Sequence, residues 1–170
     1  MPSVSKSKKS KGPSKKGQYI YTDLSDCKNS TEKVHFYATI LDAQFPHKSF
    51  KSDKYVCSMK IADQSCNIEK SNGWVNHCTL VLFANKFEDL PISQRVGDII
   101  RVHRATVGEY KGQKQFTANI FFNSSWAIFA PSVPKKSSID VEFRPYQFFG
   151  KALSFDNLEQ KILRTLRKWV

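Results

Sequence analysis

The chain has 170 residues, of which 40% are apolar and 13% aromatic, so it can bury the core of one domain with appendages. No apolar run approaches the roughly 20 residues that a membrane-spanning helix needs. Lysines and serines also stand at the amino terminus, where a signal peptide would be apolar, so nothing supports a membrane role.

Residues 1–18 consist of Ser, Lys, Gly and Pro with almost nothing apolar, and we predict a disordered basic tail there. Such a tail could be a nuclear-import signal, a nonspecific DNA contact or a solubilising terminus. Of the net charge of +12, this tail holds six lysines and residues 151–170 add +3, which leaves +3 for residues 17–150. Because residues 17–150 are only mildly basic, we expect a ligand that binds in a local groove through base stacking as well as charge. A protein that coats duplex DNA through phosphate contacts alone would be more basic.

Residues 19–150 carry the alternation of apolar and polar residues that is typical of β-strands. In the second strand Cys57 and Met59 should point inward, while Ser58 and Lys60 point to solvent. A short helix over residues 86–90 ends before Pro91, because the residue preceding a proline avoids helical geometry. Loops are predicted at 45–53 and 108–114, and strands at 34–41, 55–63, 78–84, 97–107 and 116–129. Five strands with a helix between the third and fourth predict an all-β OB-fold barrel.

Residues 151–170 predict a C-terminal helix. Ser154 is a suitable N-cap, and Leu158, Ile162, Leu166 and Trp169 recur with Phe155 at helical spacing. The apolar stripe of this helix needs something to pack on, so we expect the chain to be a fragment of a longer protein.

Cysteines and carboxylates give no sign of a metal site or of catalysis. The four cysteines (27, 57, 66 and 78) form no CxxC pair and are expected to be reduced thiols. His77 and Cys78 are adjacent, but no ligand spacing is repeated. Glu88, Asp89 and Asp98 have no evident partner, and neither a nucleophile–base pattern nor a phosphate-binding loop is present. We therefore expect no enzyme activity, no metal and no cofactor.

Aromatic and basic residues interleave around the solvent face of the second strand and the two predicted loops, which converge on one side of an OB barrel. Such a mixture favours unstacked single strands, since exposed rings stack bases and cations hold phosphates. Phe45 and Tyr110 are predicted to stack, and Phe83 either stacks or packs inward. Asp63, His103 and Arg104 could read base edges or form surface ion pairs. Phe36, Phe122 and Trp126 are expected in the core.

Four stretches resemble the ciliate telomere end-binding protein alpha subunits. They are Val34 to Ala38, Lys86 to Ile92, Gly97 to Thr106 and Ser124 to Ala127, and the likeness resumes from Leu163 to Trp169. The protection-of-telomeres proteins share the region from Leu90 to Ile99 more loosely.

The resemblance implies that this OB fold binds the G-rich single-stranded 3′ overhang of telomeres in the nucleus and protects chromosome ends. It also implies a second OB fold behind this one, to which the helix over residues 151–170 is the linker. It places the stacking tyrosine on Tyr110 and polar contacts on Gln113, Lys114 and Gln115, beside Phe116. In the other loop Phe45 and Lys48 match, while His47 replaces a tyrosine and can still stack. The C-terminal fold that recruits a beta-type subunit is absent, so this chain should not form that interface.

Two alternatives remain open at the level of sequence. The same platform could bind any single-stranded DNA or RNA with little selectivity. It could instead be a protein-interaction module that binds telomerase-associated proteins or a copy of itself.

Overall fold

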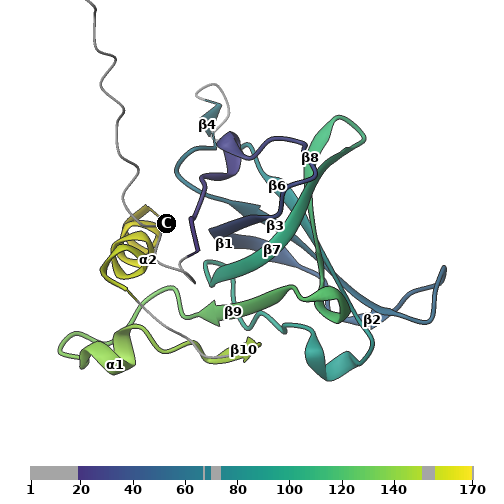
Figure 1. The fold of residues 1–170 in the computed structure, drawn as a ribbon. Helices are drawn as coiled ribbons and strands as arrows, with labels where there is room; N and C mark the ends of the chain where they lie inside the picture. Colours follow the sequence, from purple (N-terminus) through teal and green to yellow (C-terminus); the bar gives the residue numbers. More distant parts are fainter. Residues whose placement is uncertain (1–18, 67, 70–73, 151–155, 170) are drawn as a thin grey trace, which may run out of the picture.

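The computed structural model describes residues 19–66, 68–69, 74–150 and 156–169. Within these residues five long strands close a barrel (Figure 1) in the order β1–β3–β6–β8–β7, with β7 pairing back to β1. The β6–β8 pairing is parallel and the other four barrel pairings are antiparallel. The strands are β1 (Val34–Ala43), β3 (Tyr55–Ala62), β6 (Cys78–Ala84), β7 (Ile99–Tyr110) and β8 (Gln113–Asn119). The predicted OB fold is confirmed, with the 3-10 turn η2 (Phe87–Asp89) between its third and fourth barrel strands.

Further elements, most of them short, lie around this barrel, and the sequence pattern did not reveal most of them. β2 pairs with β3, β4 pairs with β5, and β10 pairs with β9. No helix in the described ranges is long and apolar enough to cross a bilayer. The elements are η1 (Leu24–Asp26), β2 (His47–Lys48), β4 (Ile68–Glu69), β5 (Trp74–Val75), η3 (Ile120–Phe122), β9 (Ser125–Phe129), α1 (Ile139–Glu142), β10 (Gln147–Phe149) and α2 (Asn157–Trp169).

The barrel interior follows the two-residue period of the strands. Cys57 and Met59 are buried in the core as predicted, and so is Ile61, while Lys60 is exposed and Ser58 partly exposed. Phe36 and Phe116 meet at the centre, with ring centroids 4.7 Å apart. The side chains that alternate with these core residues therefore form the outer surface of the barrel.

The single fifth strand predicted over 116–129 is wrong, because the chain turns at η3 and continues as β9. Asn123 adopts a φ of 75°, a left-handed conformation that asparagine tolerates well. The Ser124 hydroxyl fixes this turn by donating to the carbonyl of Arg104 at 2.7 Å. β9 then pairs with the first half of β7, whereas β8 pairs with its second half.

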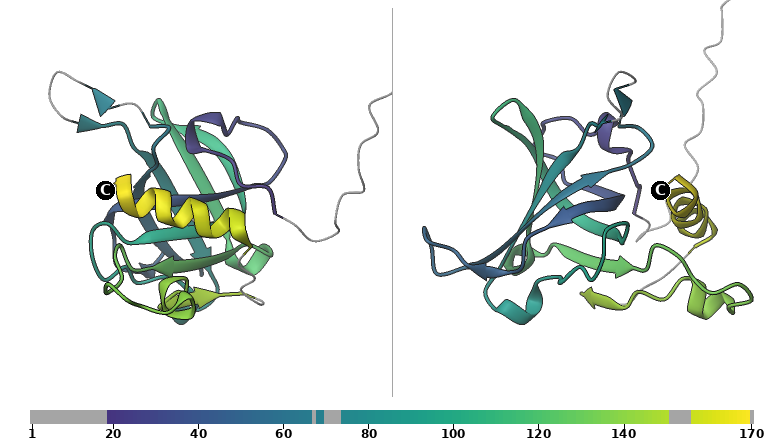
Figure 2. Two further views of the ribbon diagram at one scale, coloured as in Figure 1. Left: turned by 90° about the vertical axis from the view of Figure 1, so that its left-hand side faces the viewer. Right: turned by 180° about the vertical axis from the view of Figure 1, so that it is seen from behind.

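Helix α2 lies across the outside of the barrel (Figure 2). Leu163 and Leu166 are buried there in a second apolar cluster with Tyr37, Phe129 and others. Leu158 is 55% exposed, contrary to the predicted stripe, because the face that packs runs through positions 159, 163 and 166. Asp156 accepts a hydrogen bond from the Glu159 amide at 2.8 Å, as an N-cap does. The predicted cap Ser154, Phe155 and the predicted tail over 1–18 lie outside the described residues.

A buried ion pair also joins α2 to the barrel. Glu159 accepts a hydrogen bond from the Arg101 guanidinium at 3.1 Å, and both side chains are almost fully buried. The hydroxyls of Tyr21 and Tyr37 donate to the same carboxylate. Because a buried charge needs such partners, this cluster fixes where the helix sits.

Candidate nucleic-acid interface

Three adjacent strands, β3, β6 and β8, present an open outer face. Their register places the outward side chains in rows that cross all three strands. These side chains are partly or fully exposed. The rows are Lys60–Thr79–Gln115, Ser58–Val81–Thr117 and Val56–Phe83–Asn119. We call these nine residues the strand face; they include a lysine, several hydrogen-bonding groups and one aromatic ring, and no carboxylate.

Two loops flank the strand face, as the sequence predicts. The first, over residues 44–54, carries Phe45, which is 63% exposed, and the fully exposed Phe50. His47 and Lys48 form β2 beside them and are exposed. The second loop, predicted over 108–114, is only the turn at 111–112; Tyr110, the last residue of β7 beside this turn, is 61% exposed. Both rings that were expected to stack bases are therefore accessible to a ligand.

A third aromatic group borders the strand face at η3 and was missed by the sequence reasoning. Phe122 is 72% exposed and not in the core as predicted, and Phe121 beside it is 40% exposed. The Lys54 ammonium lies 4.6 Å from the centre of the Phe121 ring. The turn-forming residues from Asn123 to Ser125 could have indicated that the strand ends here. Aromatic residues next to a turn do not follow the inward–outward alternation of a strand and can be exposed.

Two residues predicted to contact nucleic acid are instead structural, and a third is partly engaged. Phe116 has 0% exposure, because it points into the barrel, so the prediction that it binds nucleic acid is wrong. Asp63 is also buried, because it accepts a hydrogen bond from the amide of Leu24 at 2.8 Å. The Lys114 ammonium donates to the carbonyls of Leu24 and Ser25. Asp63 and Lys114 thus fasten η1 to the barrel.

The charge around the strand face favours an anion. Its loops contribute Lys48, Lys54 and Lys111, of which Lys111 lies 5.4 Å from the centre of the Tyr110 ring. Asp53 approaches Lys54 at 3.9 Å but is itself exposed, so the pair is weak. Lysines beside exposed rings are the combination that holds phosphates while bases stack.

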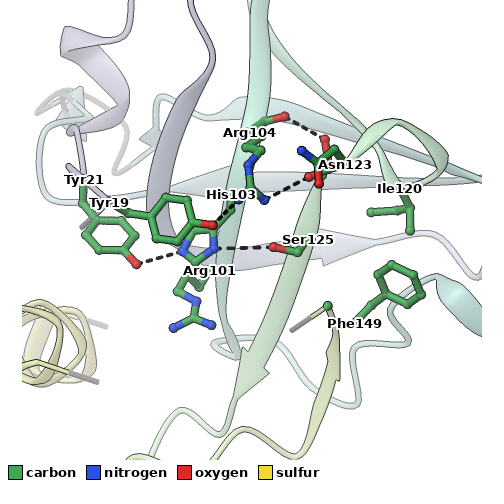
Figure 3. Close-up of a pocket in the computed structure, with 11 residues that line it drawn as sticks. Tyr19, Tyr21, Arg101, His103, Arg104, Ile120, Asn123, Ser125 and Phe149 are labelled. Atoms are coloured by element: carbon green, nitrogen blue, oxygen red, sulfur yellow. Dashed lines mark hydrogen bonds between the residues drawn. The ribbon is translucent and has the colours of Figure 1, made fainter. Parts of the chain in front are cut away.

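His103 and Arg104 lie away from the strand face, on the wall of a separate pocket of about 440 Å³ (Figure 3). The ring of Tyr19 stacks on His103 with centroids 3.8 Å apart. Burial, together with nearby Arg101, His35 and Arg104, lowers the pKa of His103 from 6.5 to about 3, so the imidazole is neutral. Since Tyr21 donates its proton to Glu159, its oxygen accepts from Nε2 of His103 at 2.8 Å. His103 and Arg104 therefore line this pocket and not the strand face, and the expectation that they read base edges stays a prediction.

Within the described ranges no three His, Cys, Asp or Glu side chains come together in a way that could hold a metal. All four cysteines are free. Burial raises the pKa of Cys57 to about 12 and that of Cys27 to about 11, which makes these thiols poor nucleophiles. The strand face, its loops and η3 carry exposed rings, lysines and polar side chains, which are groups that can bind a nucleic acid.

Comparisons with known proteins agree with this geometry. The model of the family described as telomeric single-stranded-DNA-binding POT1/CDC13 matches residues 15–170. The chain is 41% identical over 96% of its length to the telomere-binding protein subunit alpha of Stylonychia mytilus, and 42% identical over 91% to the telomere-binding protein 51 kDa subunit of Euplotes crassus. The match covers 37% of each relative, so the chain spans little more than a third of their length.

A crystal structure of fission yeast Pot1 with single-stranded DNA has a similar fold. Its TM-score is 0.66 at 16% sequence identity, over 92% of this chain and 49% of that one. At this identity the likeness supports the OB fold alone.

Proposed function

Since this chain belongs to the family of telomeric single-stranded-DNA-binding POT1/CDC13 proteins, we propose that it binds the G-rich single strand of telomeres on its strand face. The observation that carries the proposal is the placement of exposed aromatic groups at both ends of one open face, together with lysines: Phe45 and Phe122 lie at one end and Tyr110 at the other. Phe45, Tyr110 and Phe122 are each more than half exposed, although burying them would be favourable.

Single strands rather than duplexes suit this arrangement. An exposed ring stacks on an unpaired base for about 1–3 kcal/mol, and the bases of a duplex already stack on one another. The contact set that we propose combines rings, lysines and polar groups around the strand face. It comprises Phe45, His47, Lys48, Ser58, Lys60, Phe83, Tyr110, Gln113, Gln115, Phe121 and Phe122.

The family and the relatives' names suggest where this binding acts. We propose that the protein works at telomeres in the nucleus and covers the G-rich 3′ end of the chromosome, by binding and without catalysis. The Stylonychia protein is named as a subunit alpha, so the whole protein that contains this domain would work with a partner subunit.

A binding titration tests the proposal. Fluorescence anisotropy would compare a G-rich telomeric single strand with its C-rich complement and with the duplex that the two form. We expect the G-rich strand to bind most tightly and the duplex least. Equal affinity for all three would refute the proposal, and equally tight binding of a poly-pyrimidine strand or of RNA would indicate a general single-strand binder.

A further inference from the structure

Two cysteines lie against each other where the chain leaves β3 and enters β6. Cys78 is the first residue of β6 and pairs with Ile61 of β3, one residue before that strand ends. After β3 the amide of Cys66 donates to the carbonyl of Asp63 at 3.0 Å, and this turn bends the chain back. Cys66 thereby packs against the core cluster that contains Cys78, and the two thiols are hydrogen-bonded to each other.

The environment of this pair differs from that of the other two thiols. Sγ of Cys57 lies 3.3 Å from the carbonyl oxygen of Gln44 and 3.7 Å from that of Pro91. Cys27 follows η1 and is 2% exposed. Cys66, by contrast, is partly exposed, and Cys78 keeps 8% of its surface exposed. A small reagent can therefore reach the pair from solvent.

The carboxylate of Asp63 holds the turn that carries Cys66. Its Oδ1 lies 3.7 Å from Sγ of Cys66 and accepts from the amide of Ser65 at 2.9 Å. Its Oδ2 accepts from the amide of Leu24 at 2.8 Å. Because Asp63 is buried and both of its oxygens are hydrogen-bonded, the turn is held against the barrel. The Cys66 thiol thus has two acceptors, this carboxylate and the sulfur of Cys78.

A hydrogen bond and a cation favour the anionic form of Cys78. The Lys114 ammonium is fixed nearby, because it donates to two carbonyls of η1 at 3.0 and 3.2 Å. The hydrogen bond from Cys66 and the charge of Lys114 lower the pKa of Cys78 below its ordinary value, although burial opposes them. The same hydrogen bond, together with burial, raises the pKa of Cys66. Cys78 is therefore the thiolate of the pair, and Cys66 keeps its proton.

We propose that Cys66 and Cys78 are an oxidation site at which a hydroperoxide, such as hydrogen peroxide, forms a disulfide. The Cys78 thiolate attacks one oxygen of the peroxide and the O–O bond breaks. A sulfenic acid forms, and the hydroxide that leaves takes up a proton to become water. The sulfur of Cys66 then attacks the sulfur of Cys78, and its proton leaves with the displaced hydroxide as a second water. The two electrons that the sulfurs lose reduce the peroxide.

The disulfide would tie the end of β3 to the start of β6 by closing a covalent loop through residues 67–77. Thr79, the neighbour of Cys78, belongs to the strand-face row with Lys60 and Gln115. The disulfide therefore fixes one end of the strand face. Its formation goes beyond the proposed function and does not depend on what that face binds.

Peptide mapping of the folded chain tests the proposal. The protein would be treated with hydrogen peroxide, its remaining thiols alkylated, and its tryptic peptides analysed without reductant by mass spectrometry. We expect two peptides linked through Cys66 and Cys78, formed about tenfold faster than any product of Cys57. A link between Cys27 and Cys78, or equal reaction of all four cysteines, would overturn the proposal.

Single substitutions separate the roles of the two sulfurs. Cys66→Ser should stop the reaction at the sulfenic acid of Cys78, which dimedone traps, whereas Cys78→Ser should leave Cys66 unmodified at the same peroxide concentration. Cys57→Ser is the matched control, because it removes a buried thiol with other partners and should form the disulfide at the wild-type rate. Dimedone labelling of Cys66 in Cys78→Ser would contradict the assigned order of attack.

Thermal unfolding supplies a readout that needs no variant. Oxidised wild type should melt about 5–10 °C above the reduced protein, and a reductant should restore the lower value. The reason is that a bond between sulfurs already in contact constrains the unfolded chain without distorting the folded one. An unchanged or lower Tm after oxidation would show that the barrel must distort to form the bond, and would overturn the proposal.

Discussion

One outer face of the barrel is covered by a helix, whereas another is open to solvent. The outer side of β1, β7 and β9 presents Tyr37, Ile99 and Phe129, and α2 covers it (Figure 2). The strand face presents mainly Lys60, polar residues and the partly exposed Phe83, and no element covers it within the described ranges. The interior is apolar beneath both. The two faces differ in the outward-facing side chains of their strands. Apolar side chains lead the chain to pack a helix on one face, whereas polar ones leave the other face open to a ligand.

The largest effect is expected on the covered face. Glu159→Ala removes the carboxylate that pairs with the buried Arg101 guanidinium, which should lower the free energy of unfolding by about 3–5 kcal/mol. Denaturant unfolding measures this loss. Folded protein should still bind the single strand, because the strand face is elsewhere. The matched control is Glu142→Gln, whose partner Arg164 is exposed, and it should leave stability nearly unchanged.

A smaller effect, on binding, is expected at the edge of the open face. Phe122→Ala should weaken binding of a G-rich single strand by about 1–3 kcal/mol, because it removes a stacking ring. Its free energy of unfolding should hardly change, since the side chain is 72% exposed. Anisotropy and thermal unfolding on the same sample separate the two. A stability loss without a change in affinity would show that Phe122 is a packing residue after all.

The pH dependence of stability distinguishes the buried imidazole from the exposed groups. The folded pKa of His103 is about 3 and its ordinary value is 6.5, so the unfolded chain binds more protons between these values. The free energy of unfolding is therefore highest above about pH 7. It falls as the pH drops from 6.5 towards 3, and this effect of His103 is about 1.4 kcal/mol at pH 5.5. Unfolding of wild type and His103→Gln at pH 7.5 and 5.5 would measure it. Equal losses in both proteins would contradict the assignment.

The smallest effect is expected from a single lysine on the strand face. Lys60→Gln should reduce the slope of log affinity against log salt by about 0.7, the value for one phosphate contact of a single strand. Lys161→Gln on α2 is the control, because its exposed side chain lies on the covered side and should not alter the slope. An equal reduction in both variants would mean that the charge acts at long range and not at the strand face.

The sequence predicted the barrel well, because its strands follow a strict two-residue period. It placed Cys57 and Met59 inside, Lys60 outside and Phe45 on a loop, and the structure agrees. Tyr110 is exposed as expected but ends β7, because the predicted loop over 108–114 is shorter than the pattern suggested. The register of the strands could not be predicted from the sequence. It depends on long-range pairing, which decides which residues of β3, β6 and β8 lie side by side. The rows of the strand face could therefore not be written down from the pattern.

The errors share a physical origin, which is that local pattern does not show tertiary partners. Phe116 begins the predicted strand next to a loop yet fills the barrel centre, and Asp63 ends a strand yet binds the amide of Leu24. Phe122 follows the strand alternation in sequence, but the left-handed turn at Asn123 takes it out of the strand. His103 was seen beside Arg104, while the ring that covers it comes from Tyr19, far away in the chain.

The claim that the strand face is the binding surface has a direct test. Isotope-labelled protein would be titrated with a G-rich telomeric single strand while amide chemical shifts are recorded. We predict that the largest changes fall in residues 44–60, 79–83 and 110–122, with α2 nearly silent. Largest changes in α2 and β9, with the strand face silent, would contradict the account.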